Sequence, residues 1–280
     1  MAWKGYIKIM RPANCAMMGL AVIVGGVMAS GKVGFDIRLM LGFVTGFALA
    51  AVVNVQNDIY DLELDKINRP ERPLPSGELS KRSAMAFASA LLLIGLAAAT
   101  FTSPLCVVVA ALSALLGAFY NSSIKRTGLL GNIVVAFIVS MPFPYGWLVV
   151  GGSGGPLLLL FTFISFCAVL GREIAKGMAD VEGDAQKGIR TVAVANGMSI
   201  AANAVAALFI FSVLLSLLPL AMKIVSAPYL AFLVPTDAGF ILSASKILKD
   251  PSPRTAYVEK KRVLVWMALG LFAFLAGGVA

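Results

Sequence analysis

Acidic and amide side chains recur along the stretch from Asn54 to Gly77, which reads NVQNDIYDLELDKINRPERPLPSG. On a helix, its first oxygen-bearing residues share one face, and they are Asn54, Asn57, Asp58, Asp61 and Asp65. Carboxylates one helical turn apart repel each other, so helix propensity does not account for the pattern. Mg²⁺ would account for it, because this hard cation binds carboxylate and amide oxygens and completes its octahedron with water and phosphate oxygens. Arg69 and Arg72 follow, and guanidinium groups suit phosphate oxygens, so the stretch predicts a magnesium–diphosphate site.

A second acidic stretch, GREIAKGMADVEGDAQKGIRT, covers residues 171–191. Its charged residues on one side of a helix are Glu173, Lys176, Asp180 and Asp184. Asp180 follows Asp58 by 122 residues and four apolar segments, which predicts a duplicated four-helix unit with one extra terminal helix. Two acidic helix ends on one membrane face could each hold a cation on a diphosphate between them, and so neutralise the leaving group.

Three isolated polar residues each allow two interpretations. Asn14, in the first apolar run, either hydrogen-bonds a neighbouring helix or faces the site, because an unpaired amide in lipid costs roughly a few kcal/mol. Lys125 follows the fourth apolar run and either anchors the chain at the cytoplasmic surface or binds phosphate. Asp237, next but one after Pro235, lies near the middle of the eighth run and is either functional or bonded to a neighbouring span.

Composition excludes several classes of protein. Of the 280 residues, 59% are hydrophobic and 13% charged, and the mean hydropathy is +0.90. These values indicate a polytopic membrane protein, which we expect to form one domain over residues 1–280. The sequence has no histidine, which excludes His-ligated zinc or haem and any Ser-His or Cys-His nucleophile pair. Cys15, Cys106 and Cys167 lie far apart in apolar runs, so they are interpreted as packing residues.

Nine segments are long and apolar enough to cross a hydrocarbon core of ~30 Å at ~1.5 Å per residue. They cover residues 12–30, 39–58, 84–101, 104–120, 131–150, 156–173, 199–220, 228–246 and 262–279. If alternate connections lie on opposite sides, 20 of the 23 lysines and arginines fall on one side, which is then the cytoplasmic side. This places the N-terminus and both acidic stretches in the cytoplasm and the C-terminus outside the cell membrane. The net charge of +9 is thereby explained by topology, without a nucleic-acid partner, and the run from Lys246 to Arg262 is interpreted as a loop.

Several motifs together resemble the UbiA superfamily of intramembrane prenyltransferases. They are Arg11-Pro12-Ala13-Asn14, Asn57-x-x-x-Asp61-x-x-x-Asp65, Tyr120 with Lys125, and Asp180-x-x-x-Asp184. The resemblance covers nearly the whole chain and implies an all-α, barrel-like bundle of nine transmembrane helices, open laterally to membrane lipid, with two Mg²⁺ ions on an isoprenyl diphosphate. Within the superfamily, the two acidic stretches are most similar to archaeal digeranylgeranylglyceryl phosphate synthases. Gly177-Met178-Ala179 departs from that pattern, which usually carries acids there.

The resemblance implies transfer of a geranylgeranyl group from its diphosphate donor to a lipid-phosphate acceptor, geranylgeranylglyceryl phosphate, with no obligate protein partner. The implied catalytic residues are Asp58, Asp61, Asp65, Asp180 and Asp184. The implied ligands of Mg²⁺ are Asn57, Asp61, Asp65, Asp180 and Asp184. The expected substrate-binding residues are Asn14, Asn54, Asn57, Arg69, Arg72, Tyr120, Lys125 and Lys176.

Two other functions remain open at this point. Prenylation of an aromatic ring, as in quinone synthesis, belongs to the same superfamily, and the cations near the site favour a phosphorylated acceptor only mildly. A cation transporter could also use two intramembrane acidic clusters related by a repeat. A transport path, however, needs polar residues that reach both faces of the membrane, whereas both acidic stretches are predicted on the cytoplasmic face.

Overall fold

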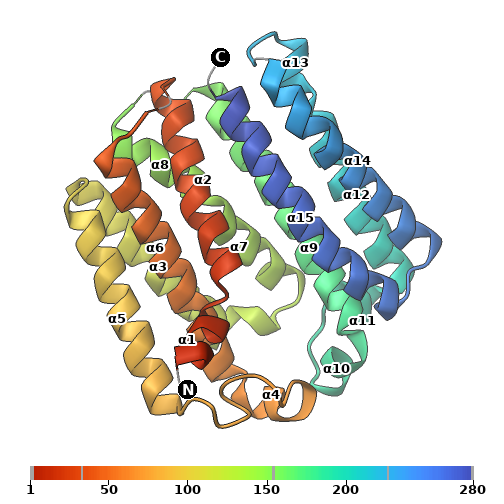
Figure 1. Cartoon of the computed structure of the whole chain (residues 1–280). Coiled ribbons are helices and arrows are strands. Elements are labelled where there is room, and N and C mark those ends of the chain that lie inside the picture. Colours follow the sequence, from red (N-terminus) through yellow and green to blue (C-terminus); the bar gives the residue numbers. More distant parts are fainter. Residues whose placement is uncertain (1–2, 33, 153–154, 226, 279–280) are drawn as a thin grey trace.

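The computed structural model describes residues 3–32, 34–152, 155–225 and 227–278, and within these ranges every regular element is a helix. The long helices lie side by side in a bundle (Figure 1). They are α2 (Pro12–Ser30), α3 (Ile37–Tyr60), α5 (Lys81–Thr100), α6 (Pro104–Ser122), α9 (Pro156–Ala179), α12 (Met198–Ser216), α14 (Ala227–Lys249) and α15 (Pro253–Gly277). The two ends of the chain lie at opposite ends of this bundle. Because every described element is a helix, the structure confirms the expected all-α architecture.

Shorter helices complete the fold. At the end of the bundle near the N-terminus lie α1 (Trp3–Met10), α4 (Leu62–Asn68) and α10 (Val181–Gln186) (Figure 1). A 3₁₀ turn η1 (Ile124–Arg126) follows α6, and α11 (Val192–Asn196) precedes α12. Two of the predicted spans are each divided into two helices. Span 131–150 consists of α7 (Leu129–Ser140) and α8 (Pro142–Val150), and span 199–220 consists of α12 and α13 (Leu218–Ala221). Pro142 and Pro219 stand in the first turn of the second piece, where the missing N–H costs no helical hydrogen bond.

Local sequence explains where several helices begin. Ser80 and Ser252 each accept a hydrogen bond from the backbone N–H three residues later, which caps the first turns of α5 and α15. Asp36 caps α3 in the same manner through the N–H of Arg38. Proline occupies the first helical position of α2, α6, α9 and α15, where its fixed φ already suits a helix.

Small residues let the helices at the centre approach closely. A Cβ on Gly25 of α2 would lie 2.0 Å from the carbonyl oxygen of Phe143, and one on Gly146 of α8 would lie 1.9 Å from that of Val22. The backbones of α2 and α8 therefore touch, and only glycine fits at these two positions. This contact fixes α2 in the middle of the bundle, between the N-terminal and C-terminal halves.

Eight helical segments within the described residues are long and apolar enough to span a membrane, so the chain is a multi-pass membrane protein. Large apolar side chains such as Leu93 and Phe101 remain exposed on the outer faces, as lipid contact requires. The ninth predicted span, 262–279, falls within α15 up to Gly277, while Val279 lies outside the described residues. The count of nine remains a prediction.

Two expectations about local structure are wrong. The run from Lys246 to Arg262 is not a loop, because α14 continues to Lys249 and α15 begins at Pro253. Glu259 in this run is fully buried, accepts from Ser243 at 2.8 Å and pairs with Arg262 at 2.6 Å. In addition, neither acidic stretch is one uninterrupted helix, because one residue outside the helices, Asp61 or Asp180, divides each stretch.

Candidate functional site

A cavity of about 1680 Å³ lies between the two halves of the bundle and reaches the end that carries α4 and α10. Its lining includes every predicted site residue except Asp58. These residues are Asn14, Asn54, Asn57, Asp61, Asp65, Arg69, Arg72, Tyr120, Lys125, Lys176, Asp180 and Asp184. Residues separated by more than a hundred positions in sequence thus share one space, as the two acidic stretches predicted.

Each acidic stretch bends at an aspartate. Asp61 is the single residue between α3 and α4, and Asp180 is the single residue between α9 and α10. Backbone hydrogen bonds of the α-helical type continue across both breaks, from Asp61 N–H to Asn57 O (2.9 Å) and from Asp180 N–H to Lys176 O (3.0 Å). The structural counterpart of Asp180 is therefore Asp61, which corrects the earlier pairing of Asp180 with Asp58. Asp65 and Asp184 then correspond, each one turn further along.

Cations from other elements meet the first acidic pair. Lys125, from η1, forms an ion pair with Asp61. Arg72 Nη1 lies 2.5 Å from Asp65 Oδ2, although Arg72 follows α4 in a loop. With its side-chain amide turned to donate to Asp61 (3.1 Å), Asn57 accepts from Lys125 at 2.9 Å. The carboxylates and cations of this half therefore neutralise each other at the cavity wall.

Asp58 occupies a different position from the other predicted acids. Its side chain is buried, does not line the cavity, and pairs with Arg11 as well as with Arg72 Nη1 at 3.2 Å. A buried carboxylate needs such partners, and two guanidinium groups satisfy it. Asp58 thereby ties the loop after α4 to the junction of α1 and α2, and its geometry suits a residue that positions Arg72.

The second acidic pair has its own cation. Lys260, on the first turns of α15, is only 8% exposed, and its Nζ lies 3.6 Å from Asp180 Oδ2. Burial lowers the pKa of Lys260, and the neighbouring Asp180 opposes this effect. Burial likewise raises the pKa of Asp184, and the negative charge of Asp180 adds to the rise. A cation placed between these two aspartates would relieve both effects on Asp184.

Glu173 organises the remaining charges on α9. Its buried carboxylate lies 2.5 Å from Lys176 Nζ and 3.2 Å from Arg172 Nη1. Both cations line the cavity, so Glu173 holds them at the wall. Tyr120, which is buried at the end of α6, lines the same region. Asn54 donates to the carbonyl oxygen of Met10 at 3.0 Å and so also links α3 to the end of α1.

Three residues of the site were not among the predicted ones. Arg11 and Lys260 line the cavity and pair with Asp58 and Asp180, and the side chain of buried Asn121 lies 3.2 Å from the side-chain amide of Asn57. For Arg11, the Arg-Pro-Ala-Asn opening was a usable signal. Lys260 stood in a run interpreted as a loop, and Asn121 follows Tyr120 without any charge to mark it, so neither offered a comparable signal.

The donor atoms fit Mg²⁺ in two separate groups. Across the residues that the structure describes, no three acidic, cysteine or histidine side chains gather into a ready-made metal cage. Asn57, Asp61 and Asp65 form one set of oxygen donors, and Asp180 and Asp184 form the other. Mg²⁺ typically takes only one or two carboxylates and keeps positions for water and phosphate oxygens, so each set suits this ion.

Lys260 gives a prediction that does not depend on turnover. In Lys260→Met, affinity for inorganic diphosphate with Mg²⁺ should fall roughly tenfold to a hundredfold, because a charge-assisted hydrogen bond contributes about 1.5–3 kcal/mol. Titration calorimetry on the detergent-solubilised protein measures this affinity. Lys249→Met is the matched control, since Lys249 is exposed at the end of α14 and does not line the cavity. Equal affinities for the two variants would remove Lys260 from the site.

Comparisons with known proteins assign the chain to a family. The model of the UbiA prenyltransferase family matches residues 19–268. A curated digeranylgeranylglyceryl phosphate synthase of Methanopyrus kandleri is 37% identical over 98% of both chains. A solved structure described as giving insights into the biosynthesis of digeranylgeranylglyceryl phosphate synthase in membranes is 30% identical, covers 99% of both chains and has a TM-score of 0.76. A UbiA homologue from Archaeoglobus fulgidus, bound to GPP and Mg²⁺, has a TM-score of 0.67 at 18% identity over 96% of this chain and 99% of its own, and so shares the fold.

Proposed function

The chain belongs to the UbiA prenyltransferase family and is a membrane-embedded enzyme, and from this premise we propose that it transfers a geranylgeranyl group to geranylgeranylglyceryl phosphate. The donor would be geranylgeranyl diphosphate, and the product would carry the second ether bond of an archaeal membrane lipid. The observation that carries the proposal is a large cavity that joins two acidic helix breaks to a large set of lysines and arginines. The name of the Methanopyrus kandleri relative supports the same product.

Two sets of residues would hold Mg²⁺ in this proposal, Asn57 with Asp61 and Asp65, and Asp180 with Asp184. Mg²⁺ bound there would offset the negative charge that develops on the departing diphosphate. The fold shared with a homologue that is bound to GPP and Mg²⁺ agrees with this assignment. Lys125 and Arg72, which pair with Asp61 and Asp65, lie where they could turn to the phosphate oxygens.

The protein's other contributions follow from the cavity walls. Departure of diphosphate leaves an allylic cation, which the apolar walls below the acidic residues would shield from water. Because this cation is a strong electrophile, the glycerol hydroxyl can attack it before losing its proton, which the released diphosphate can then accept. A chain without histidine therefore has the groups it needs for this reaction. The lysines and arginines would hold both phosphorylated headgroups so that the hydroxyl oxygen and the allylic carbon meet.

The orientation in the membrane is part of the proposal. Twenty of the 23 lysines and arginines fall on the side that carries the acidic helix breaks, so we place this side and the N-terminus in the cytoplasm. Both phosphorylated substrates would then reach the cavity from the side on which they are made. In sealed vesicles, a cysteine introduced on the side of the acidic helix breaks should be labelled from the cytoplasmic face. Labelling from the outer face instead would show that the orientation is reversed.

Product identification tests the proposed function. Purified protein is incubated with geranylgeranyl diphosphate, geranylgeranylglyceryl phosphate and Mg²⁺, and the lipid extract is analysed by mass spectrometry. We expect a product that contains both geranylgeranyl chains and one phosphate, together with released diphosphate. Product formed only with 4-hydroxybenzoate would instead favour the hypothesis that the protein prenylates an aromatic ring.

Arg69 gives a second prediction from the headgroup contacts. Moving an isoprenoid chain from the bilayer into an apolar cavity exchanges one hydrocarbon environment for another, so the headgroups must supply most of the affinity. Arg69 lines the cavity and has no ion pair within the described part of the chain. Arg69→Ala should therefore raise the KM of one phosphorylated substrate roughly tenfold or more, through loss of about 1.5–3 kcal/mol. Shortening that substrate by one isoprene unit should change KM less.

Steady-state kinetics with each substrate varied in turn provide the measurement. Arg82→Ala is the control, because Arg82 is exposed at the start of α5 and does not line the cavity. We expect Arg72→Ala and Lys125→Ala to raise KM as well, but these variants also leave carboxylates without a partner, so Arg69 gives the cleaner result. Unchanged KM values in all three variants would mean that these cations do not bind the headgroups of the substrates.

A further inference from the structure

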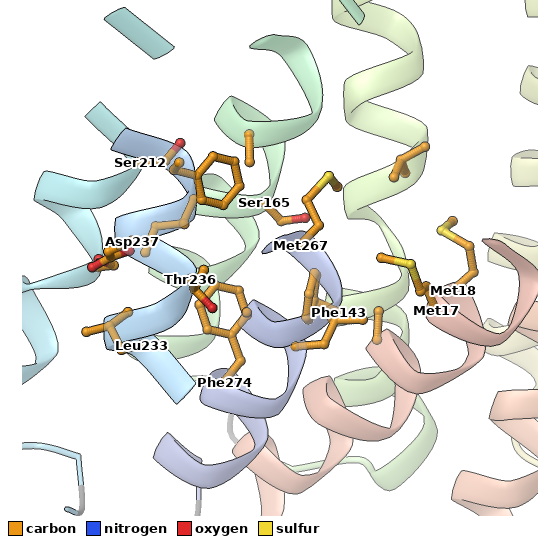
Figure 2. Close-up of a pocket in the computed structure, with 18 residues that line it drawn as sticks. Met17, Met18, Phe143, Ser165, Ser212, Leu233, Thr236, Asp237, Met267 and Phe274 are labelled. Carbon is orange, nitrogen blue, oxygen red and sulfur yellow. The ribbon is translucent and has the colours of Figure 1, made fainter. Parts of the chain in front are cut away.

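A second, smaller cavity lies among α2, α7, α8, α9, α12, α14 and α15 (Figure 2). We call it the chamber, and its volume is about 70 Å³. Its walls are mostly apolar, with Phe143, Leu233, Phe240 and Phe274 among them, while Asp237 lies at one side. None of the predicted catalytic or headgroup residues lines it.

The chamber adjoins the main cavity. Met17, Met18, Val139 and Met267 line both spaces, so the two spaces adjoin at these flexible or small apolar side chains. Helix α9 runs along both: Ile164 and Ala168 line the chamber, and Asp180, which lines the main cavity, directly follows the end of the same helix. At ~1.5 Å per residue, the chamber lies about 18–24 Å along α9 from Asp180. This is the scale of an extended four-unit isoprenoid chain that starts at the acidic site.

The size of the chamber suits the branched end of such a chain. A cavity of ~150 Å³ lined by leucine, isoleucine and phenylalanine stays dry and binds benzene, and the chamber has about half that volume. Phe274 forms part of its wall and stacks on Phe161 with ring centroids 4.0 Å apart. Ser216 donates to Asp237 at 2.8 Å, and this polar pair disfavours the passage of an alkyl chain beyond it.

The main cavity also has an apolar part on the other side of α2. We call it the arm, and it lies among α2, α3, α6 and α8, with Val22, Leu49, Ala110 and Tyr145 in its walls. Two separate groups of buried side chains surround the arm and the chamber. Val22, Ala110 and Tyr145 belong to one group, and Phe143, Ile164 and Phe274 belong to the other. The closely packed α2 and α8 lie between them.

An enzyme that joins two isoprenoid lipids must house two long chains at once. Resting on the proposed function, we propose that the chamber receives the end of the isoprenoid chain of one substrate, while the arm receives the chain of the other. Each space would then set the preferred length of one isoprenoid chain, independently of the other. Donor and acceptor carry the same chain chemistry, so the experiment decides which substrate enters which space.

Two substitutions fill the two spaces separately. A Cβ on Gly270 of α15 would meet only Thr236 Cγ2, at 3.5 Å, so Gly270→Ala fits without a shift and Gly270→Leu would extend into the chamber. Ala110→Leu would fill the arm in the same way. Val265→Leu is the matched control, because Val265 is 54% exposed on the lipid-facing side of α15.

Binding is measured for the donor and the acceptor separately, each with a geranylgeranyl chain and with a farnesyl chain. Gly270→Leu should weaken binding of the geranylgeranyl form of one substrate at least tenfold relative to its farnesyl form, with Gly270→Ala in between. Ala110→Leu should do the same for the other substrate only, and Val265→Leu should change neither preference. Melting temperatures in detergent show whether each variant folds. If Gly270→Leu does not fold, the smaller substitution Gly270→Ala still tests the chamber.

If both filling variants affected the same substrate, or if neither changed a chain-length preference, the inference would be overturned. Binding needs no turnover, so this outcome is separate from the proposed function. A protein that binds both lipids with crossed preferences but forms no ether would disprove the proposed reaction and leave the two chain sites standing. If the protein forms the ether but the filling variants leave the chain-length preferences unchanged, the proposed reaction stands and the two chain sites are overturned.

Discussion

Asp61→Asn and Asp180→Asn should each lower turnover by roughly a hundredfold to a thousandfold, and EDTA should abolish activity in the unsubstituted protein. Each aspartate stands alone between two helices, one in each half of the cavity. Asparagine keeps the shape but removes the charge that would hold Mg²⁺ against the diphosphate. Loss of one electrostatic contact to a transition state in a water-poor site costs about 2.7–4 kcal/mol in comparable cases.

Asp65→Asn and Asp184→Asn should show losses of the same kind, because each lies one turn after the break in its own half. Single-turnover assays at saturating substrate separate this loss of chemistry from weaker binding. Asp36→Asn serves as the control, since Asp36 caps α3 outside the cavity and asparagine caps a helix equally well. Near-normal turnover of Asp61→Asn or Asp180→Asn in the presence of EDTA would exclude the metal assignment.

Much of the fold could be predicted from the sequence because membrane spans are encoded locally. Apolar runs of about twenty residues satisfy their backbone only as helices in lipid, so α2 and α6 begin at the predicted residues, 12 and 104. The break at Met141 and the extension of α15 to Pro253 were not predicted. Hydropathy measures how apolar a segment is, and it does not report a proline-induced interruption or a charged helix that continues into water.

The candidate site was predictable where function leaves a periodic signal. Acidic side chains one turn apart place Asp61 with Asp65 and Asp180 with Asp184 at the cavity, as the structure shows. The same periodicity misplaced Asp58, which shares their face on an ideal helix. Its side chain instead meets Arg11 and Arg72, and this contact depends on how α1 and the loop after α4 pack.

Lys260 illustrates the opposite limit. In the sequence it is one of several lysines and arginines near a predicted membrane surface, and the positive-inside rule explains all of them equally. Only the packing of α15 brings this one within 3.6 Å of Asp180 and buries it. A partner 80 residues away in sequence leaves no periodic pattern, so tertiary structure was needed to find it.

Removing the phosphate from the acceptor should reduce kcat/KM by at least about a hundredfold, while the unphosphorylated lipid keeps the same reacting hydroxyl. The cavity wall carries ten lysines and arginines. Four of these form no ion pair with a carboxylate in the ranges that the structure describes, namely Arg69, Arg126, Lys187 and Lys261. Mg²⁺ would already offset much of the charge of the donor diphosphate, so these cations are available to a second phosphate.

The expected size of the effect comes from two charge-assisted contacts of about 1.5–3 kcal/mol each, which an unphosphorylated lipid cannot make. The acceptor phosphate would also hold the glycerol hydroxyl against the allylic carbon, so its loss should lower kcat as well as raise KM. Paired assays with geranylgeranylglycerol and its phosphate, at a fixed concentration of geranylgeranyl diphosphate, measure both constants. Comparable rates for the two acceptors, or faster alkylation of 4-hydroxybenzoate under the same conditions, would show that the cavity does not select a lipid phosphate.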